Sequence, residues 1–79
     1  MTLSVSEMKT RLETYLTSRS MDAVGNADTF RGIAEDERLP STLRRKAEES
    51  YRYHCSRVTT YDALIVELRS GDMDHIFSR

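Results

Sequence analysis

Basic residues cluster in the middle of the chain, where they could bind an anionic partner. Arg38, Arg45 and Arg52 are spaced seven residues apart. The whole basic cluster consists of Arg38, Arg44, Arg45, Lys46 and Arg52. It would suit an acidic protein surface or the phosphates of a nucleic acid. The alternative is a solvated face, because Glu48 and Glu49 stand four residues from arginines of the cluster and could pair with them.

Aromatic side chains are interleaved with these arginines, as in proteins that stack the bases of single-stranded nucleic acids. Three of them, Tyr51, His54 and Tyr61, fall on the apolar stripe of a helix and are therefore expected in a core or an interface. Tyr53 lies off that stripe and is expected to be exposed. We predict that a partner binds to Arg38, Arg44, Arg45, Arg52 and Tyr53.

The residue types of catalytic and metal sites do not converge in this sequence. His54 and Cys55 are adjacent, and neighbours on a helix point about 100° apart, so they would not meet at one atom. Cys55 is the one cysteine of the chain, which excludes an internal disulfide and a cysteine-rich zinc site. The acidic run 35–37 lacks the spacing of a calcium loop, and no glycine-rich phosphate loop is present. We expect no enzyme, no cofactor and no metal.

The element that must position the basic cluster is a long helix over residues 41–70. Its apolar residues alternate at spacings of four and three and form a seam, which consists of Ala47, Tyr51, His54, Val58, Tyr61, Ile65 and Leu68. The repeat runs through Thr59 and Thr60, so the helix is expected to continue there, and Gly71 is placed to end it.

Such a helix is too long for a globule of this size. Thirty residues span about 45 Å, whereas a globular chain of this length is only ~30 Å across. Either the helix bends near Thr59, or another chain buries part of the seam. An antiparallel bundle formed within one chain would bury the same apolar residues. In a parallel pair of chains, Arg57 and Asp62 would form an ion pair between strands. We predict a homodimer that associates through Tyr51, His54, Val58, Tyr61, Ile65 and Leu68.

The first half of the chain predicts weaker helices. Ser4 and Glu7 fit a capping box, so a helix should begin there, and the polar run 17–20 should end it. Residues 21–37 predict a weak helix, or a turn at Gly25 followed by a short helix over 27–36. Pro40 should interrupt the helical structure before the long helix. Met73, Ile76 and Phe77 are spaced as one helical turn, which could dock back on the rest of the domain.

Length and charge indicate one helical domain over residues 1–79. Twelve Lys and Arg balance 13 Asp and Glu, for a net charge of −1, which argues against a general nucleic-acid binder. The longest apolar run, 63–66, is too short for a membrane span or a secretion signal, so we expect a cytoplasmic protein. Domains below about 80 residues often depend on a partner subunit for stability.

One segment, residues 34–57, resembles part of a group of small proteobacterial helical proteins of uncharacterised function. The shared pattern is Leu39-Pro40, then Arg44-Arg45 with Ala47 two residues on, then Arg52 with His54 two residues on. The resemblance implies a bacterial or phage source and a helix, a loop and a second helix.

The sequence thus predicts an all-α fold, a small bundle of three to four helices with one long C-terminal helix, which self-associates. The predicted function is that of a small non-enzymatic regulator or adaptor, for example a phage-encoded or mobile-element-encoded inhibitor of a host complex. The alternative is a regulator that binds nucleic acid through the basic face of the long helix.

Overall fold

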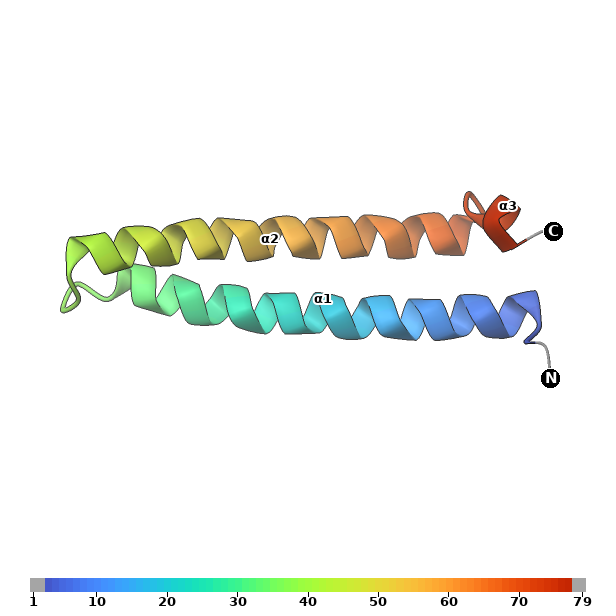
Figure 1. Ribbon diagram of the computed structural model, residues 1–79, viewed down its shortest axis with the longest axis horizontal. Helices are drawn as coiled ribbons and strands as arrows, with labels where there is room; N and C mark the ends of the chain where they lie inside the picture. The colour runs from blue at the N-terminus through green and yellow to red at the C-terminus, as the bar shows by residue number, and fades with distance from the viewer. Residues whose placement is uncertain (1–2, 78–79) are drawn as a thin grey trace.

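The protein is an antiparallel hairpin of two long helices. The computed structural model describes residues 3–77, in which α1 spans Val5–Glu35, α2 spans Ser41–Ser70 and α3 spans Asp74–Phe77. Figure 1 shows α1 and α2 lying side by side along their whole length, with α3 at the end where α1 begins. The all-α class and the long helix over 41–70 are confirmed. Neither long helix contains a stretch apolar enough to cross a membrane.

The predicted N-cap residue, Ser4, begins α1, although Glu7 pairs with the Ser4 hydroxyl and not with its backbone N–H as in a capping box. The backbone N–H of Glu7 donates to Ser4 Oγ at 3.1 Å, and the Ser4 hydroxyl donates to the Glu7 carboxylate at 3.1 Å. One of the free N–H groups at the helix start is thereby satisfied, and the carboxylate lies where the helix dipole favours negative charge.

One prediction for the first half of the chain is wrong, because the helix does not end at residues 17–20. Of the two alternatives for residues 21–37, the structure has the helix and not the turn at Gly25, since α1 is continuous to Glu35. Small side chains explain this continuity: Ser20, Ala23 and Ala27 are buried on the side of α1 that packs against α2. Tertiary packing of this kind outweighs the weak intrinsic helix propensity of single residues.

The predicted break between the helices is confirmed at residues 36–40. The Asp36 carboxylate accepts hydrogen bonds from Arg38 Nε and from the Arg38 backbone N–H, at 2.9 and 3.1 Å. These bonds, the side-chain bond above all, hold the pKa of Asp36 below its ordinary value. Pro40 then occupies the N-cap of α2, and its carbonyl oxygen accepts the first bond of that helix, from Arg44 N–H at 3.1 Å.

The long helix α2 passes through its two consecutive threonines without a bend. The Thr59 and Thr60 hydroxyls donate to the carbonyl oxygens of Cys55 and Ser56, one turn earlier, so both side chains are satisfied within the helix. The helix ends at Gly71, which has a φ of 90°, a left-handed conformation that glycine adopts without steric cost.

Glycine substitutions distinguish the two kinds of glycine in this fold. Nothing lies within 4 Å of a Cβ built on Gly25 or Gly32, so we expect Gly25→Ala and Gly32→Ala each to stabilise the hairpin by about 0.5–1 kcal/mol. Gly71→Ala should instead destabilise it by about 1 kcal/mol, because of the left-handed backbone. Urea denaturation followed by circular dichroism measures all three, and destabilisation by Gly25→Ala would contradict the exposed position of this residue in α1.

The packing of α1 explains how so short a chain covers so long a helix. Leu16, Ile65 and Leu68 form a buried cluster near α3, and the side chains packed against it are Leu12, Tyr61, Leu64, Met73 and Phe77. The docking of the tail turn is thus confirmed for Met73 and Phe77, while Ile76 is exposed.

The molecule measures 55 × 22 × 15 Å with a radius of gyration of 17.3 Å, against about 12 Å for a globule of this length. The helix α2 does not bend near Thr59. Because α1 is as long as α2, it packs along the whole length of that helix.

Candidate functional site

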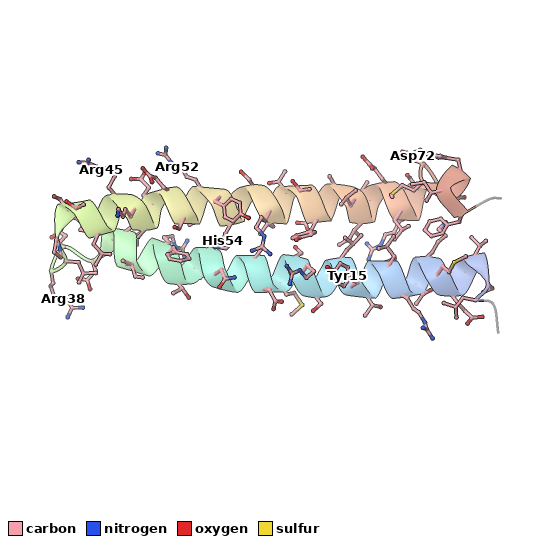
Figure 2. All side chains as sticks on the ribbon, viewed as in Figure 1. Tyr15, Arg38, Arg45, Arg52, His54 and Asp72 are labelled. Carbon is pink, nitrogen blue, oxygen red and sulfur yellow. The ribbon has the colours of Figure 1, made fainter. Side chains whose placement is uncertain are left out.

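The structure does not bring the predicted partner-binding residues together on one face. Arg45 and Arg52 project side by side from the outer side of α2, whereas Arg38 lies at the loop on the opposite side of the molecule (Figure 2). The half-buried Arg44 donates from Nε to the Ala34 carbonyl oxygen at 3.2 Å and so links the two helices. Tyr53 is 63% exposed, which confirms the expectation for this residue.

Much of the charge of the basic cluster is neutralised within the chain. Arg38 pairs with Asp36 at 2.9 Å, and Arg52 pairs with Glu48 at 2.9 Å, one helical turn away. Arg45 is exposed and forms no ion pair within residues 3–77. The solvated, paired face that the sequence offered as an alternative therefore describes part of this cluster.

The seam predicted for self-association packs inside the hairpin. Ala47, Ile65 and Leu68 are buried, and the remaining members are half-buried: Tyr51, His54, Val58 and Tyr61. His54 lies between the two helices in Figure 2. Asp62, expected to pair with Arg57 of another chain, instead accepts a hydrogen bond from Ser20 Oγ at 2.8 Å. The antiparallel arrangement within one chain thus uses most of this apolar surface.

One edge of the hairpin carries a continuous set of aromatic and guanidinium groups from both helices. This ladder consists of Arg19 and Phe30 from α1 and Tyr53, His54, Arg57 and Tyr61 from α2. The rings of Phe30 and His54 stack with centroids 5.5 Å apart and an interplanar angle of 6°. Tyr53 meets His54 edge to face at 5.1 Å. These contacts are typical of favourable aromatic pairs.

Arg57 is the central member of the ladder. Its guanidinium carbon lies 5.9 Å from the centre of the Tyr53 ring and 5.7 Å from that of Tyr61, within cation–π range of both. Its Nη1 donates to His54 Nδ1 at 3.0 Å. Because an arginine can only donate, Nδ1 must be the acceptor, and the neutral His54 ring carries its proton on Nε2.

Arg19 of α1 lies close to Arg57 and Tyr61 of α2. Hydrogen bonds from Arg57 and then Arg19 to the Tyr61 hydroxyl lower the pKa of that phenol below its ordinary value. The Nε of Arg19 is buried and has no hydrogen-bond partner. Two cations from different helices are therefore held beside one neutral hydroxyl group.

A shallow depression of about 530 Å³ adjoins this pair of arginines. Its lining is mostly polar and consists of Arg19, Met21, Asp22, Gly25, Asn26, Thr29 and Arg57. Gly25 has nothing within 4 Å of a built Cβ, so the fold does not require a glycine there. The depression is open to solvent and suits a side chain of a partner rather than an enclosed substrate.

The opposite edge carries a smaller and more apolar groove of about 210 Å³. It is lined by Val24, Ala27, Asp28, Arg31, Tyr51, Cys55 and Val58. A hydrogen bond with Cys55 raises the pKa of Tyr51 above its ordinary value. His54 belongs to the ladder and Cys55 to this groove, so their side chains lie apart. In the described part of the chain, no three His, Cys, Asp or Glu side chains are grouped as a metal site would require.

The tyrosines should ionise in a definite order. We expect Tyr61 to ionise at a lower pH than an ordinary tyrosine, because Arg57 and Arg19 stabilise its phenolate, and Tyr51 at a higher pH. Phenolate absorbance in the near ultraviolet measures this order. Tyr61→Phe should remove the earliest component and Tyr51→Phe the latest. A titration in which Tyr61→Phe removes a late component would contradict the ladder geometry.

Sequence reasoning missed Arg19 and Phe30 as site residues and gave Arg57 a different partner. One usable signal was present, since Tyr53, Arg57 and Tyr61 are spaced four residues apart and so lie on one side of a helix. The contributions of α1 depend on the alignment of the two helices, which spacing within one helix does not reveal. No protein-family model matches the chain, and no curated protein or solved structure is significantly similar to it.

Proposed function

We propose that this protein is a small non-enzymatic regulator or adaptor that acts by binding another protein through its helical surface. The observation that carries this proposal is the amount of apolar surface that two helices leave uncovered. The exposed large apolar side chains are Val5, Tyr15, Met21, Val24, Leu43, Tyr53, Val66 and Ile76. A lone hairpin buries only one stripe of each helix, and domains this small gain stability by association.

Tyr53 is the strongest candidate for an anchor in such an interface. It is exposed, sits beside Arg57 in the ladder and shares α2 with the exposed Arg45 and Arg52. Tyrosine and arginine are the residue types that dominate binding energy at protein interfaces. The charges of Arg45 and Arg52 favour an acidic partner surface.

Affinity capture tests the proposal. The triple variant Arg45→Ala, Arg52→Ala and Tyr53→Ala should bind a partner captured from the source organism at least about tenfold more weakly than the wild type. The control replaces Arg11 and Thr14, exposed residues of α1 outside this apolar set, with alanine, and should bind normally. Equal binding by the triple variant and the wild type would show that this assignment is wrong.

We also propose that the protein forms a homodimer. Tyr51 and Val58 of the seam remain half-buried and line the apolar groove with Val24, where a second copy would cover them. Sedimentation of Val24→Glu should give a monomer, whereas the control Ser18→Glu, an exposed position on the same helix, should sediment as the wild type does. A wild-type protein that sediments as a monomer at every concentration would refute dimerisation.

Nucleic-acid binding is the alternative, supported by the exposed Arg45 and Arg52 (Figure 2). The ion pairs of Arg38 and Arg52 reduce the charge available for phosphates, and the net charge of −1 opposes it. Titration of the protein with duplex and single-stranded oligonucleotides at low salt tests this alternative. Binding that weakens steeply as salt is added would favour nucleic-acid binding over protein binding.

A further inference from the structure

Arg19 and Arg57 form no ion pair with a carboxylate, which is also true of Arg11, Arg44, Arg45 and Lys46 among the described cations. Five ion pairs occupy basic side chains elsewhere: those of Lys9, Arg31, Arg38, Arg52 and Arg69. Arg19 and Arg57 form none within residues 3–77, although they lie close together at the junction of the two helices. Asp22 lies near Arg19 but forms no ion pair with it, so the two positive charges are only partly compensated.

The acceptors that these two guanidinium groups do find are neutral. Arg57 donates to a ring nitrogen of His54 at 3.0 Å, its guanidinium carbon lies 5.7 Å from the centre of the Tyr61 ring, and both arginines are close enough to the Tyr61 hydroxyl to lower its pKa. The buried Nε of Arg19 has no acceptor among residues 3–77. A guanidinium group binds a carboxylate more strongly than a neutral acceptor, because two charge-assisted hydrogen bonds form in one plane.

The surroundings leave room for one small anionic group. The depression next to the arginines has a volume of about 530 Å³, and Gly25 contributes no side chain to it. The Thr29 hydroxyl in its lining donates to the Gly25 carbonyl oxygen and so stays within the helix. Asp22 also lines the depression, and its negative charge disfavours a polyanion strand there more than it disfavours a single carboxylate.

We propose that Arg19 and Arg57, together with the Tyr61 hydroxyl, form a binding site for a carboxylate side chain, aspartate or glutamate, of the partner protein. This site rests on the proposed function in one respect, namely that the bound carboxylate belongs to a partner protein. Net charge favours this source over nucleic acid, because the whole chain carries −1 and only two cations converge at the site. Tyr53, stacked beside Arg57, would contact apolar atoms next to the bound carboxylate.

Titration of the intact protein with a blocked glutamate tests the site without a known partner. The probe is N-acetylglutamate N-methylamide, and its glutamine counterpart is the neutral control. We expect saturable shifts in the NMR signals of the Arg19 and Arg57 side-chain N–H groups with the glutamate probe only. Bound carboxylate should also raise the pKa of Tyr61, since it draws both guanidinium groups away from the phenolate.

Three variants make the test specific. Arg57→Gln should weaken binding of the glutamate probe at least about tenfold. Arg57→Lys keeps the charge but loses the planar pair of donors, and should weaken binding by a smaller factor. Arg11→Gln removes an exposed arginine of α1 that forms no ion pair within residues 3–77, and should leave binding unchanged. Circular dichroism of each variant confirms that the hairpin is folded.

Four results would overturn the site. They are equal shifts with the glutamine control, equal weakening by Arg11→Gln, no shift at either arginine, and saturation of the same signals by a single-stranded oligonucleotide but not by glutamate. These outcomes are separable from the proposed function. If glutamate fails to bind while partner capture still depends on Tyr53, the site is wrong and protein binding stands. If glutamate binds while no protein is captured, the proposed function fails and the site stands.

Discussion

Replacing Leu68 with alanine is expected to unfold most of the hairpin. Leu68 is 1% exposed and belongs to the cluster with Leu16 and Ile65, near the end where α3 docks. Truncating a fully buried leucine lowers the free energy of unfolding by about 2–5 kcal/mol. A domain of fewer than about 80 residues has only ~3–5 kcal/mol in total. The variant should therefore lose most of its helical circular dichroism signal at room temperature.

Val66→Ala is the matched control for this experiment. Val66 lies two residues earlier on the same helix and is 64% exposed, so its truncation should change the free energy of unfolding by no more than about 0.5 kcal/mol. Urea denaturation at two protein concentrations separates folding from association, because an associating protein is stabilised at the higher concentration. Equal denaturation midpoints for the two variants would mean that this cluster does not hold the helices together.

The contact between α1 and α2 pairs small residues on one helix with larger ones on the other. Ser20, Ala23 and Ala27 on α1 are buried, whereas the facing side of α2 carries residues such as Tyr61 and Ile65. Small side chains let the two backbones approach closely, and the larger ones fill the space beside them. The Ser20 hydroxyl donates to the Asp62 carboxylate at 2.8 Å, so this buried polar group is satisfied within the contact.

This asymmetry explains why the two helices differ in predictability. The bounds of α2 follow from large apolar residues at regular spacing, a break at Pro40 and a left-handed end at Gly71. In α1 the buried stripe is Leu16 followed by Ser20, Ala23 and Ala27, and these last three give little hydrophobic contrast in the sequence. Gly25 also suggested a break in the helix, but it faces solvent. The small loss of helix stability that it causes is outweighed by the packing of the opposite side of α1 against α2.

The candidate site was predictable only in part, for a related reason. Tyr53 could be recognised as exposed because its position off the seam depends on one helix alone. The meeting of Arg19 with Tyr61 depends on the alignment of two helices, which is set by contacts such as Glu13 with Arg69 at 2.6 Å. The basic cluster showed the opposite error, since Arg38 lies on the opposite side of the molecule from Arg45 and Arg52, although the three are close in sequence (Figure 2).

Replacing Ala23 with glutamate should disrupt the hairpin at the middle of α1. Ala23 is 0% exposed on the side of α1 that packs against α2, so a glutamate side chain there is too large for the space between the helices and carries its charge out of water. Overpacking a tight contact costs about 1–3 kcal/mol, and withdrawing a charge from water adds about 3 kcal/mol or more. That is as much as the whole hairpin is expected to have, so α1 should separate from α2 and lose most of its helicity.

The control for this variant is Ala63→Glu, which places the same side chain at an exposed position of the other long helix. Thermal denaturation followed by circular dichroism should show a folded Ala63→Glu protein and a largely unfolded Ala23→Glu protein. Should both variants melt alike, the helices could not be packed through the small residues of α1. The ladder would then lose its basis as well, since Arg19 reaches Tyr61 only when that stripe faces α2.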